Sequence, residues 1–236
     1  MRRGAVQIAG IADADEARLL VECGVDFLGF PFRLDFHRED CNEEDAARIV
    51  ASLPERVGAV LITYLADPRE IAALARALGV GWVQLHGEVE PEAVDALRAA
   101  APRLAVAKSL VVRGGDAAEL RAAVGRYAPR VDAFLTDSFD PATGATGATG
   151  RTHDWEISRE LACHSPRPLV LAGGLTPGNV RSAILAVRPA AVDAHTGVEG
   201  SDGRKRPELV GRFVAEARAA FARTAGGRRD PVSGGG

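Results

Sequence analysis

The sequence predicts an α/β protein that folds as a single-domain (β/α)8 barrel, also called a TIM barrel. Short apolar runs alternate with longer amphipathic segments, and this alternation occurs eight times within the 236 residues. A barrel of this kind often needs about 250 residues as one unit. An open doubly wound sheet usually has fewer strands, and no Gly-x-Gly-x-x-Gly motif follows the first apolar run.

The expected strands are continuous apolar runs bounded by Gly or Asp, a pattern typical of parallel strands that are covered on both faces. Aromatic residues make up only 5 % of the chain, so the core must consist mainly of Ala, Val, Leu and Ile. In chain order the expected strands are Ala5–Ala9, Asp26–Phe30, Val57–Ile62, Trp82–Leu85, Leu104–Ser109, Ala133–Thr136, Leu169–Ala172 and Ala191–Ala194.

Each expected strand is followed by a segment with apolar residues at helical spacing. In the first such segment, Ala17, Leu19, Leu20 and Cys23 fall on one side. Several of the segments begin beside a proline, which costs little in the first turn of a helix. In chain order the expected helices are Asp13–Cys23, Glu43–Leu53, Pro68–Leu78, Pro91–Ala100, Ala117–Tyr127, Trp155–Ala162, Pro177–Ala186 and Glu208–Arg223.

The composition is that of a soluble globular protein, with 47 % apolar residues, 26 % charged residues and a formal charge of −3. This balance excludes collagen, a disordered acidic tail and a strongly basic nucleic-acid binder. No run reaches about 18 apolar residues, so neither a signal peptide nor a membrane span is expected. The three cysteines lack metal-like spacing, which predicts no disulfide framework and no zinc site and fits a reducing cytoplasm.

No linker interrupts the alternation of expected strands and helices, so residues 1–223 are expected to form one domain. The remaining residues 224–236 are rich in Gly, Arg and Ser and are expected to be a disordered tail. Residues Ser138–Gly150 contain a repeated Ala-Thr-Gly and are too long for a plain connection. This segment is either a mobile lid or an unimportant insertion.

In such barrels the active site lies at the carboxyl ends of the strands. Gly-bearing loops follow strands seven and eight, the usual phosphate cradle of the fold, where helix N-termini favour an anion. Ordinary turn glycines are the alternative reading. Asp193 and His195, at the end of strand eight, are further candidates for substrate contacts. The candidate phosphate contacts are Gly173, Gly174, Thr196, Gly197 and Val198.

Polar side chains also end other strands. Gln84 and His86 share one face of strand four and are expected at the barrel mouth, although a lone His is more often structural. Asp137 lies at the end of strand six. A carboxylate at this end of a barrel strand costs free energy and is expected there only if it has a function, so Asp137 is the leading candidate acid. Arg38 lies in a polar loop after strand two and either clamps a carboxylate or is a solvated charge.

Taken in order, these motifs resemble those of the phosphoribosylanthranilate isomerase family, the (β/α)8 enzymes of tryptophan biosynthesis. The resemblance runs from about Val6 to Phe221. The motifs that carry it are Gln84-Leu85-His86-Gly87, Leu135-Thr136-Asp137-Ser138, the segment from Gly147 to Trp155, Leu171-Ala172-Gly173-Gly174-Leu175 and the segment from Asp193 to Glu199.

The resemblance implies an Amadori rearrangement of an N-(5-phosphoribosyl) aromatic amine, without a metal or an organic cofactor. It assigns the general acid to Asp137 and the contact with the anthranilate carboxylate to Arg38. It also places Gly173, Gly174 and Gly197 in the phosphate cradle. The implied partner is a small phosphorylated substrate, with no nucleic acid and no membrane. Members of the family occur as monomers and dimers, so this chain is expected to be a monomer or a homodimer.

The general base of the family does not carry over, because its cysteine at the end of strand one is replaced by Ala9. Alanine cannot accept a proton. His86, Asp13 and His195 are candidates for a substitute base. Gln7 for Lys, His195 for Ser, His153 for Phe and Ala148 for Gly are further departures from the family pattern.

Three functions are therefore open. The first is the family reaction with a substitute base. The second, slightly favoured for the native task because the base is missing, is a different acid-led reaction on a related phosphorylated or aromatic-amine substrate in specialised metabolism. The third is a non-catalytic protein that binds a phosphorylated ligand. Asp137 and Arg38 argue against the third function, because a simple phosphate binder needs neither residue.

Overall fold

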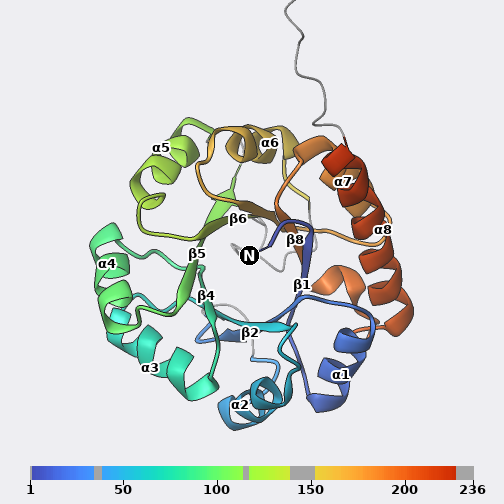
Figure 1. Cartoon of the computed structure of the whole chain (residues 1–236), viewed down its shortest axis with the longest axis horizontal. Helices are drawn as coiled ribbons and strands as arrows, with labels where there is room; N and C mark the ends of the chain where they lie inside the picture. The colour runs from blue at the N-terminus through green and yellow to red at the C-terminus, as the bar shows by residue number, and fades with distance from the viewer. Residues whose placement is uncertain (1, 35–38, 114–116, 139–151, 227–236) are drawn as a thin grey trace, which may run out of the picture.

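The computed structural model describes residues 2–34, 39–113, 117–138 and 152–226. Its strands form a closed barrel in which each strand pairs in parallel with its neighbours in the sequence, and β8 pairs with β1. The helices form a ring around the barrel (Figure 1). The strands are β1 (Ala5–Ala9), β2 (Phe27–Phe32), β3 (Gly58–Thr63), β4 (Trp82–Leu85), β5 (Ala105–Val112), β6 (Ala133–Ser138), β7 (Leu169–Leu171) and β8 (Ala191–Ala194).

The expected (β/α)8 barrel is confirmed, and several element boundaries differ by one to three residues. The helices are α1 (Ala14–Glu22), α2 (Glu43–Ser52), α3 (Pro68–Leu78), α4 (Pro91–Ala100), α5 (Ala117–Tyr127), α6 (Trp155–His164), α7 (Val180–Val187) and α8 (Pro207–Gly226). A short 3-10 helix, η1 (Thr196–Val198), follows β8.

One of the three-residue differences is at α7, which begins at Val180 and not at Pro177. The side chain of Asn179 accounts for it. Its amide donates to the Gly174 carbonyl at 2.9 Å, and its oxygen accepts from the Thr176 amide at 2.8 Å. These bonds close a turn that ends the β7–α7 loop, so the helix starts after the turn.

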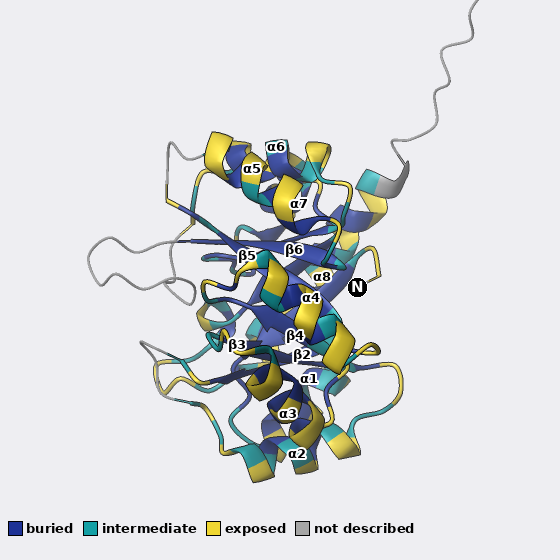
Figure 2. Cartoon of the chain, turned by 90° about the vertical axis from the view of Figure 1, so that its left-hand side faces the viewer, coloured by how far each residue is buried: buried dark blue, intermediate teal, exposed yellow. Residues whose placement is uncertain are grey.

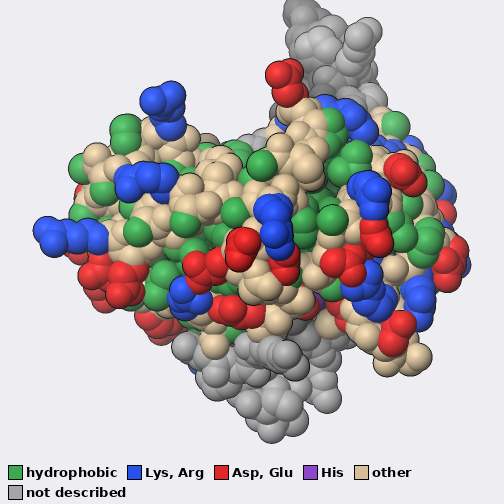
Figure 3. Space-filling view, turned by 90° about the horizontal axis from the view of Figure 1, so that it is seen from below, with side chains coloured by type: hydrophobic (Ala, Val, Ile, Leu, Met, Phe, Trp, Pro, Cys, Tyr) green, Lys and Arg blue, Asp and Glu red, His purple; other side chains and the backbone are tan. Residues whose placement is uncertain are grey.

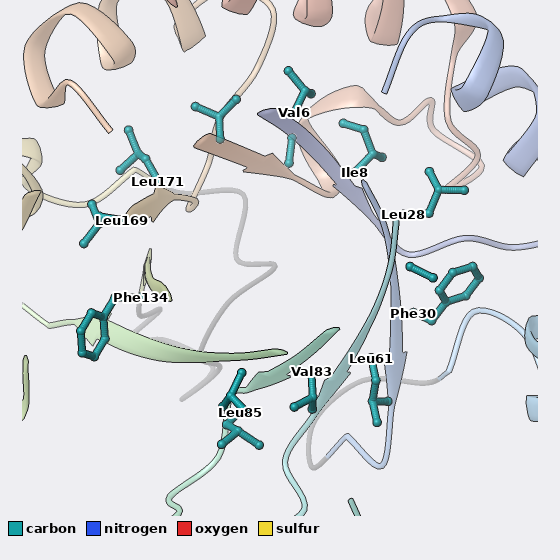
Figure 4. Close-up of a cluster of buried hydrophobic side chains, with 14 of the residues drawn as sticks. Val6, Ile8, Leu28, Phe30, Leu61, Val83, Leu85, Phe134, Leu169 and Leu171 are labelled. Atoms are coloured by element: carbon teal, nitrogen blue, oxygen red, sulfur yellow. The ribbon is translucent and has the colours of Figure 1, made fainter. Parts of the chain in front are cut away.

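The main core lies between the strands and the helices. Val6, Ile8 and Phe134, with their neighbours drawn in Figure 4, point away from the barrel axis and pack against the helices. Figure 2 shows the consequence, with buried strands at the centre and helices exposed on their outer sides. Inside the barrel, Ala9, Val60 and Ile62 form a separate cluster, and Phe27 and Trp82 pack against it.

The surface carries charges of both signs. On the face seen in Figure 3, Lys and Arg side chains lie among Asp and Glu side chains, and neither sign forms a continuous patch. Within the described ranges, the helices are all too short or too polar to cross a membrane. Helix α8 continues to Gly226, and the rest of the expected tail lies outside the described residues, as do residues 139–150 of the low-complexity loop.

Candidate active site

Two buried carboxyl groups face the barrel interior near the carboxyl ends of β6 and β8. Asp137 is the fifth residue of β6, and Asp193 is the third residue of β8. Burial raises the pKa of Asp137 from 3.8 to about 7, while a hydrogen bond from the Ser138 amide opposes the shift. Asp137 therefore carries a proton for much of the time at neutral pH, as a general acid must.

Asp193 is perturbed in the same direction. Burial raises its pKa to about 8, and the nearby Asp137 charge adds to the rise, while a hydrogen bond from Gln7 opposes it. Two close carboxyl groups cannot both ionise cheaply in a buried site. The two groups thus titrate as a pair that retains protons near neutral pH.

A pair of glutamine side chains lies beside these carboxyl groups. Gln7 lies beside Asp193 in the β1–β8 ladder, and its Nε2 donates to Gln84 Oε1 at 3.3 Å. Gln7 Oε1 and Asp193 Oδ1 are both buried, and neither has a hydrogen-bond partner within the described part of the chain. A proton on Asp193 suits this arrangement, because a neutral carboxyl costs less to bury than a carboxylate.

His86, expected at the barrel mouth, follows directly after β4 and is buried. Its Nδ1 lies 2.9 Å from the Ser109 hydroxyl of β5, and its ring packs edge-on against Tyr64 with centroids 5.0 Å apart. Lys108, the residue before Ser109, is also buried. Its Nζ donates to the carbonyls of Gly87 and Ser109 at 3.0 and 3.1 Å, which fixes the loop that follows His86.

The two candidate phosphate loops lie next to each other. A Cβ added at Gly197 would be only 1.9 Å from the Leu175 carbonyl oxygen, so the loop after β8 touches the loop after β7 at a point where only glycine fits. Gly173 and Gly174 both adopt positive φ, at 87° and 59°. Thr196 and Val198 belong to η1, a short extra helix at the place where such barrels often bind phosphate.

One neighbour of these loops is not evident from sequence spacing. A Cβ added at Gly173 would lie 3.0 Å from His153 Nδ1. His153 Nε2 in turn lies 2.6 Å from the Ser158 hydroxyl, which donates to Thr136 at 3.0 Å. This chain of contacts holds an imidazole beside the glycine loop.

His195 occupies the end of β8 beside the end of β1. The β1–β8 ladder ends with Ile8 opposite Ala194, so the next positions are Ala9 and His195. A Cβ added at Gly10 would fall 2.1 Å from His195 Nε2, which shows that the imidazole lies directly on the Gly10 backbone. Ala9 itself is buried and packs against Val60 and Ile62.

Asp13 is placed differently. It caps the N-terminus of α1 by accepting from the Glu16 amide at 2.9 Å and pairs with Arg204 at 2.6 Å. These contacts hold the pKa of Asp13 below its usual value. Arg38, the expected contact for an anthranilate carboxylate, lies outside the described residues. Across the described ranges, no group of three or more His, Cys, Asp or Glu side chains is arranged to hold a metal ion.

The fold and this site define the class of protein: a (β/α)8 barrel whose mouth joins a pair of proton-retaining carboxyl groups to glycine loops suited to an anion. Comparison with known families narrows the class. The family model for N-(5′-phosphoribosyl)anthranilate isomerase matches residues 6–216. The chain belongs to that family.

Individual relatives agree with this assignment. The chain is 35 % identical over 217 residues to N-(5′-phosphoribosyl)anthranilate isomerase 2 of Methanosarcina mazei, covering 92 % of this chain and 95 % of the relative. A solved monomeric form of the dimeric isomerase from Thermotoga maritima is 32 % identical, with a TM-score of 0.74 and coverage of 91 % and 98 %. A phosphoribosylanthranilate isomerase in complex with reduced 1-(o-carboxyphenylamino)-1-deoxyribulose 5-phosphate is 33 % identical, with a TM-score of 0.75 and the same coverage.

Proposed function

We propose that this protein converts N-(5′-phosphoribosyl)anthranilate into 1-(o-carboxyphenylamino)-1-deoxyribulose 5-phosphate, with Asp137 as the general acid. Membership of the family supports the reaction. The burial of Asp137, which raises the pKa of its carboxyl to about 7, supports its assignment as the acid. The family relationship favours this reaction over the different acid-led reaction that the missing base had slightly favoured.

In the first step, Asp137 donates its proton to the ring oxygen of the ribose, and the C1′–O bond breaks. The nitrogen lone pair forms the C1′=N bond of a protonated Schiff base. Burial supports this role, because a carboxyl with a pKa of about 7 is still protonated when the substrate binds and yet acidic enough to give up the proton.

In the second step, a base removes the proton from C2′. The electrons of the C2′–H bond form the C1′=C2′ bond of an enolamine, and the nitrogen becomes neutral. Tautomerisation of the enolamine to the ketone then completes the rearrangement. Gln7 lies between Asp193 and Gln84, pairing with the first and donating to the second, and this proximity supports a role for both residues in binding the sugar hydroxyls.

The phosphate of the substrate binds between the β7 and β8 loops in this proposal. The contact of Gly197 with Leu175, the positive φ of Gly173 and Gly174, and the short helix η1 support it. Arg38 remains the expected contact for the anthranilate carboxylate. Residues 1–223 are proposed to act as one catalytic domain, as a monomer or a homodimer, and the free thiols of Cys23, Cys41 and Cys163 fit a reducing cytoplasm.

Steady-state turnover of N-(5′-phosphoribosyl)anthranilate by the purified chain tests this function. We expect conversion by the wild type and loss of conversion in Asp137→Asn, which keeps the shape of the side chain but cannot donate a carboxyl proton. Conversion that is absent in the wild type, or that is unaffected by Asp137→Asn, would refute the reaction or the acid respectively.

A further inference from the structure

We propose that His195 is the general base of this enzyme and takes the role of the family's cysteine, which Ala9 replaces. This inference rests on the proposed isomerisation. It starts from two departures from the family pattern, Ala9 for Cys and His195 for Ser, which are far apart in the sequence. The β1–β8 ladder places these two positions side by side at the barrel mouth.

The imidazole of His195 contacts the backbone of the residue that follows the position of the lost thiol. The ring of His195 covers the backbone of Gly10, the residue that follows Ala9, and Gly10 provides the space because it has no side chain. With φ at +76°, the Gly10 backbone is also in a region that other residues rarely adopt. The base thus moves from the residue that ends β1 to the residue that follows β8, which lies beside the end of β1.

The surroundings suit an imidazole that gains a proton. His195 Nε2 lies 3.4 Å from Glu199 Oε1 and 4.0 Å from Asp40 Oδ1, so two carboxyl groups face the ring. Lys205 pairs with the same oxygen of Glu199 at 2.5 Å, and its backbone amide donates to the buried Glu16. The carboxyl groups stabilise the imidazolium formed when a proton is accepted, and Lys205 keeps Glu199 in place.

The other candidates for a substitute base fit less well. His86 lies at the end of β4, three strands away from β1, and its Nδ1 is engaged with Ser109. Asp13 is tied to Arg204 and to the N-terminus of α1, and the lowered pKa makes it a weaker base. Asp193 lies two residues before His195 in the β1–β8 ladder, opposite Gln7, and, with a pKa of about 8, it retains its proton at neutral pH.

The proposed step transfers the C2′ proton of the Schiff base to a neutral imidazole nitrogen of His195. The C2′–H bond breaks, its electrons form the C1′=C2′ bond, and the iminium nitrogen takes up the former C1′=N pair. His195 leaves the step as an imidazolium and returns the proton to solvent or to C1′ during tautomerisation. The step needs no oxidant, metal or further reactant.

The experiment compares kcat and its pH dependence for wild type, His195→Gln, and the double variant Ala9→Cys/His195→Gln on N-(5′-phosphoribosyl)anthranilate. His195→Gln keeps a polar side chain of similar size but cannot act as a base near neutral pH. We expect it to lower kcat by about 10²–10⁴-fold, the usual contribution of a positioned base. The double variant should regain at least about tenfold, because the thiol returns to the position at which the family carries it.

The pH dependence of kcat separates a catalytic role from a structural effect. In the wild type, the acidic limb of the kcat profile should reflect the titration of an imidazole. In the double variant, the apparent pKa of that limb should move toward that of a thiol, which is ordinarily about 8.5. His164→Gln is the matched control: His164 is exposed at the end of α6, and its replacement should leave kcat unchanged. Circular dichroism and the affinity for the reduced product analogue check that the variants fold and bind.

A kcat in His195→Gln within about threefold of the wild type, with Asp137→Asn inactive, would overturn the role of His195 and leave the proposed isomerisation intact. A large loss that Ala9→Cys does not restore, with the pH limb unchanged, would overturn it as well. If the wild type does not convert the substrate at all, the proposed function fails first.

Discussion

Replacing Asp193 with Asn should make the folded protein less sensitive to alkaline pH. In the wild type, burial and the charge of Asp137 raise the pKa of Asp193 to about 8. The folded state therefore binds more protons than the unfolded state between about pH 4 and pH 8, and its stability falls as the pH rises through this window. Asparagine resembles the protonated carboxyl in shape and does not ionise, so it escapes this loss.

The size of the effect follows from the shift. One pKa unit corresponds to 1.36 kcal/mol, so even half of the rise from 3.8 to about 8 corresponds to about 3 kcal/mol. We expect Asp193→Asn to exceed the wild type in free energy of unfolding by about 3 kcal/mol at pH 9. At pH 4, where the folded wild-type carboxyl is protonated, the two proteins should be nearly equal.

Urea unfolding at pH 4, 7 and 9 measures this difference. Asp67→Asn is a suitable control, because Asp67 is an exposed N-cap of α3 and asparagine caps helices equally well. The control should follow the wild type at each pH. An Asp193→Asn variant that differs from the wild type by the same amount at pH 4 and pH 9 would refute the assignment of a buried, proton-retaining carboxyl.

Three further predictions concern the acid, the phosphate loops and a buried lysine. Asp137→Asn should lower kcat by about 10²–10⁴-fold while the affinity for the reduced product analogue, measured by calorimetry, changes little. Gly197→Ala should weaken binding of that analogue, because its Cβ would displace the Leu175 carbonyl; unchanged affinity would argue against the cradle. Burial lowers the pKa of Lys108 from 10.5 to about 8, so below pH 8 the fold must carry a buried charge. The gain in free energy of unfolding from Lys108→Met over the wild type should be about 3 kcal/mol larger at pH 7 than at pH 10. Urea unfolding measures this gain, and an equal gain at the two pH values would contradict the prediction.

The sequence predicts the barrel well because the eight strands and helices are short, regular and in alternating order. It places the ends of several elements less well, since ends depend on side-chain contacts. The start of α7 is set by Asn179, whose amide closes a turn that a proline-based rule does not foresee. Likewise β5 continues to Val112 because β6 extends to Ser138 beside it.

The sequence likewise predicts some residues of the candidate site and misses others. Asp137 and the glycines are evident from their place after strands, because the fold fixes where such positions meet. The partners of His195 are not evident, since Asp40 and Glu199 come from different loops and only the tertiary structure brings them to one imidazole. The raised pKa of Asp193 also depends on burial and on Asp137, neither of which its neighbours in the sequence reveal.

The closure of the barrel between β1 and β8 has a consequence for how activity arises during folding. Every other strand pair joins consecutive strands, whereas this pair joins the first strand to the last. Gln7 and Ala9 from the first strand meet Asp193 and His195 from the last strand only at this seam. A chain that has formed seven strands therefore has most of its core but has not yet brought the residues of β1 beside Asp193 and His195. Catalysis should appear with the last cooperative step of folding, and it should be among the first properties lost when the seam opens.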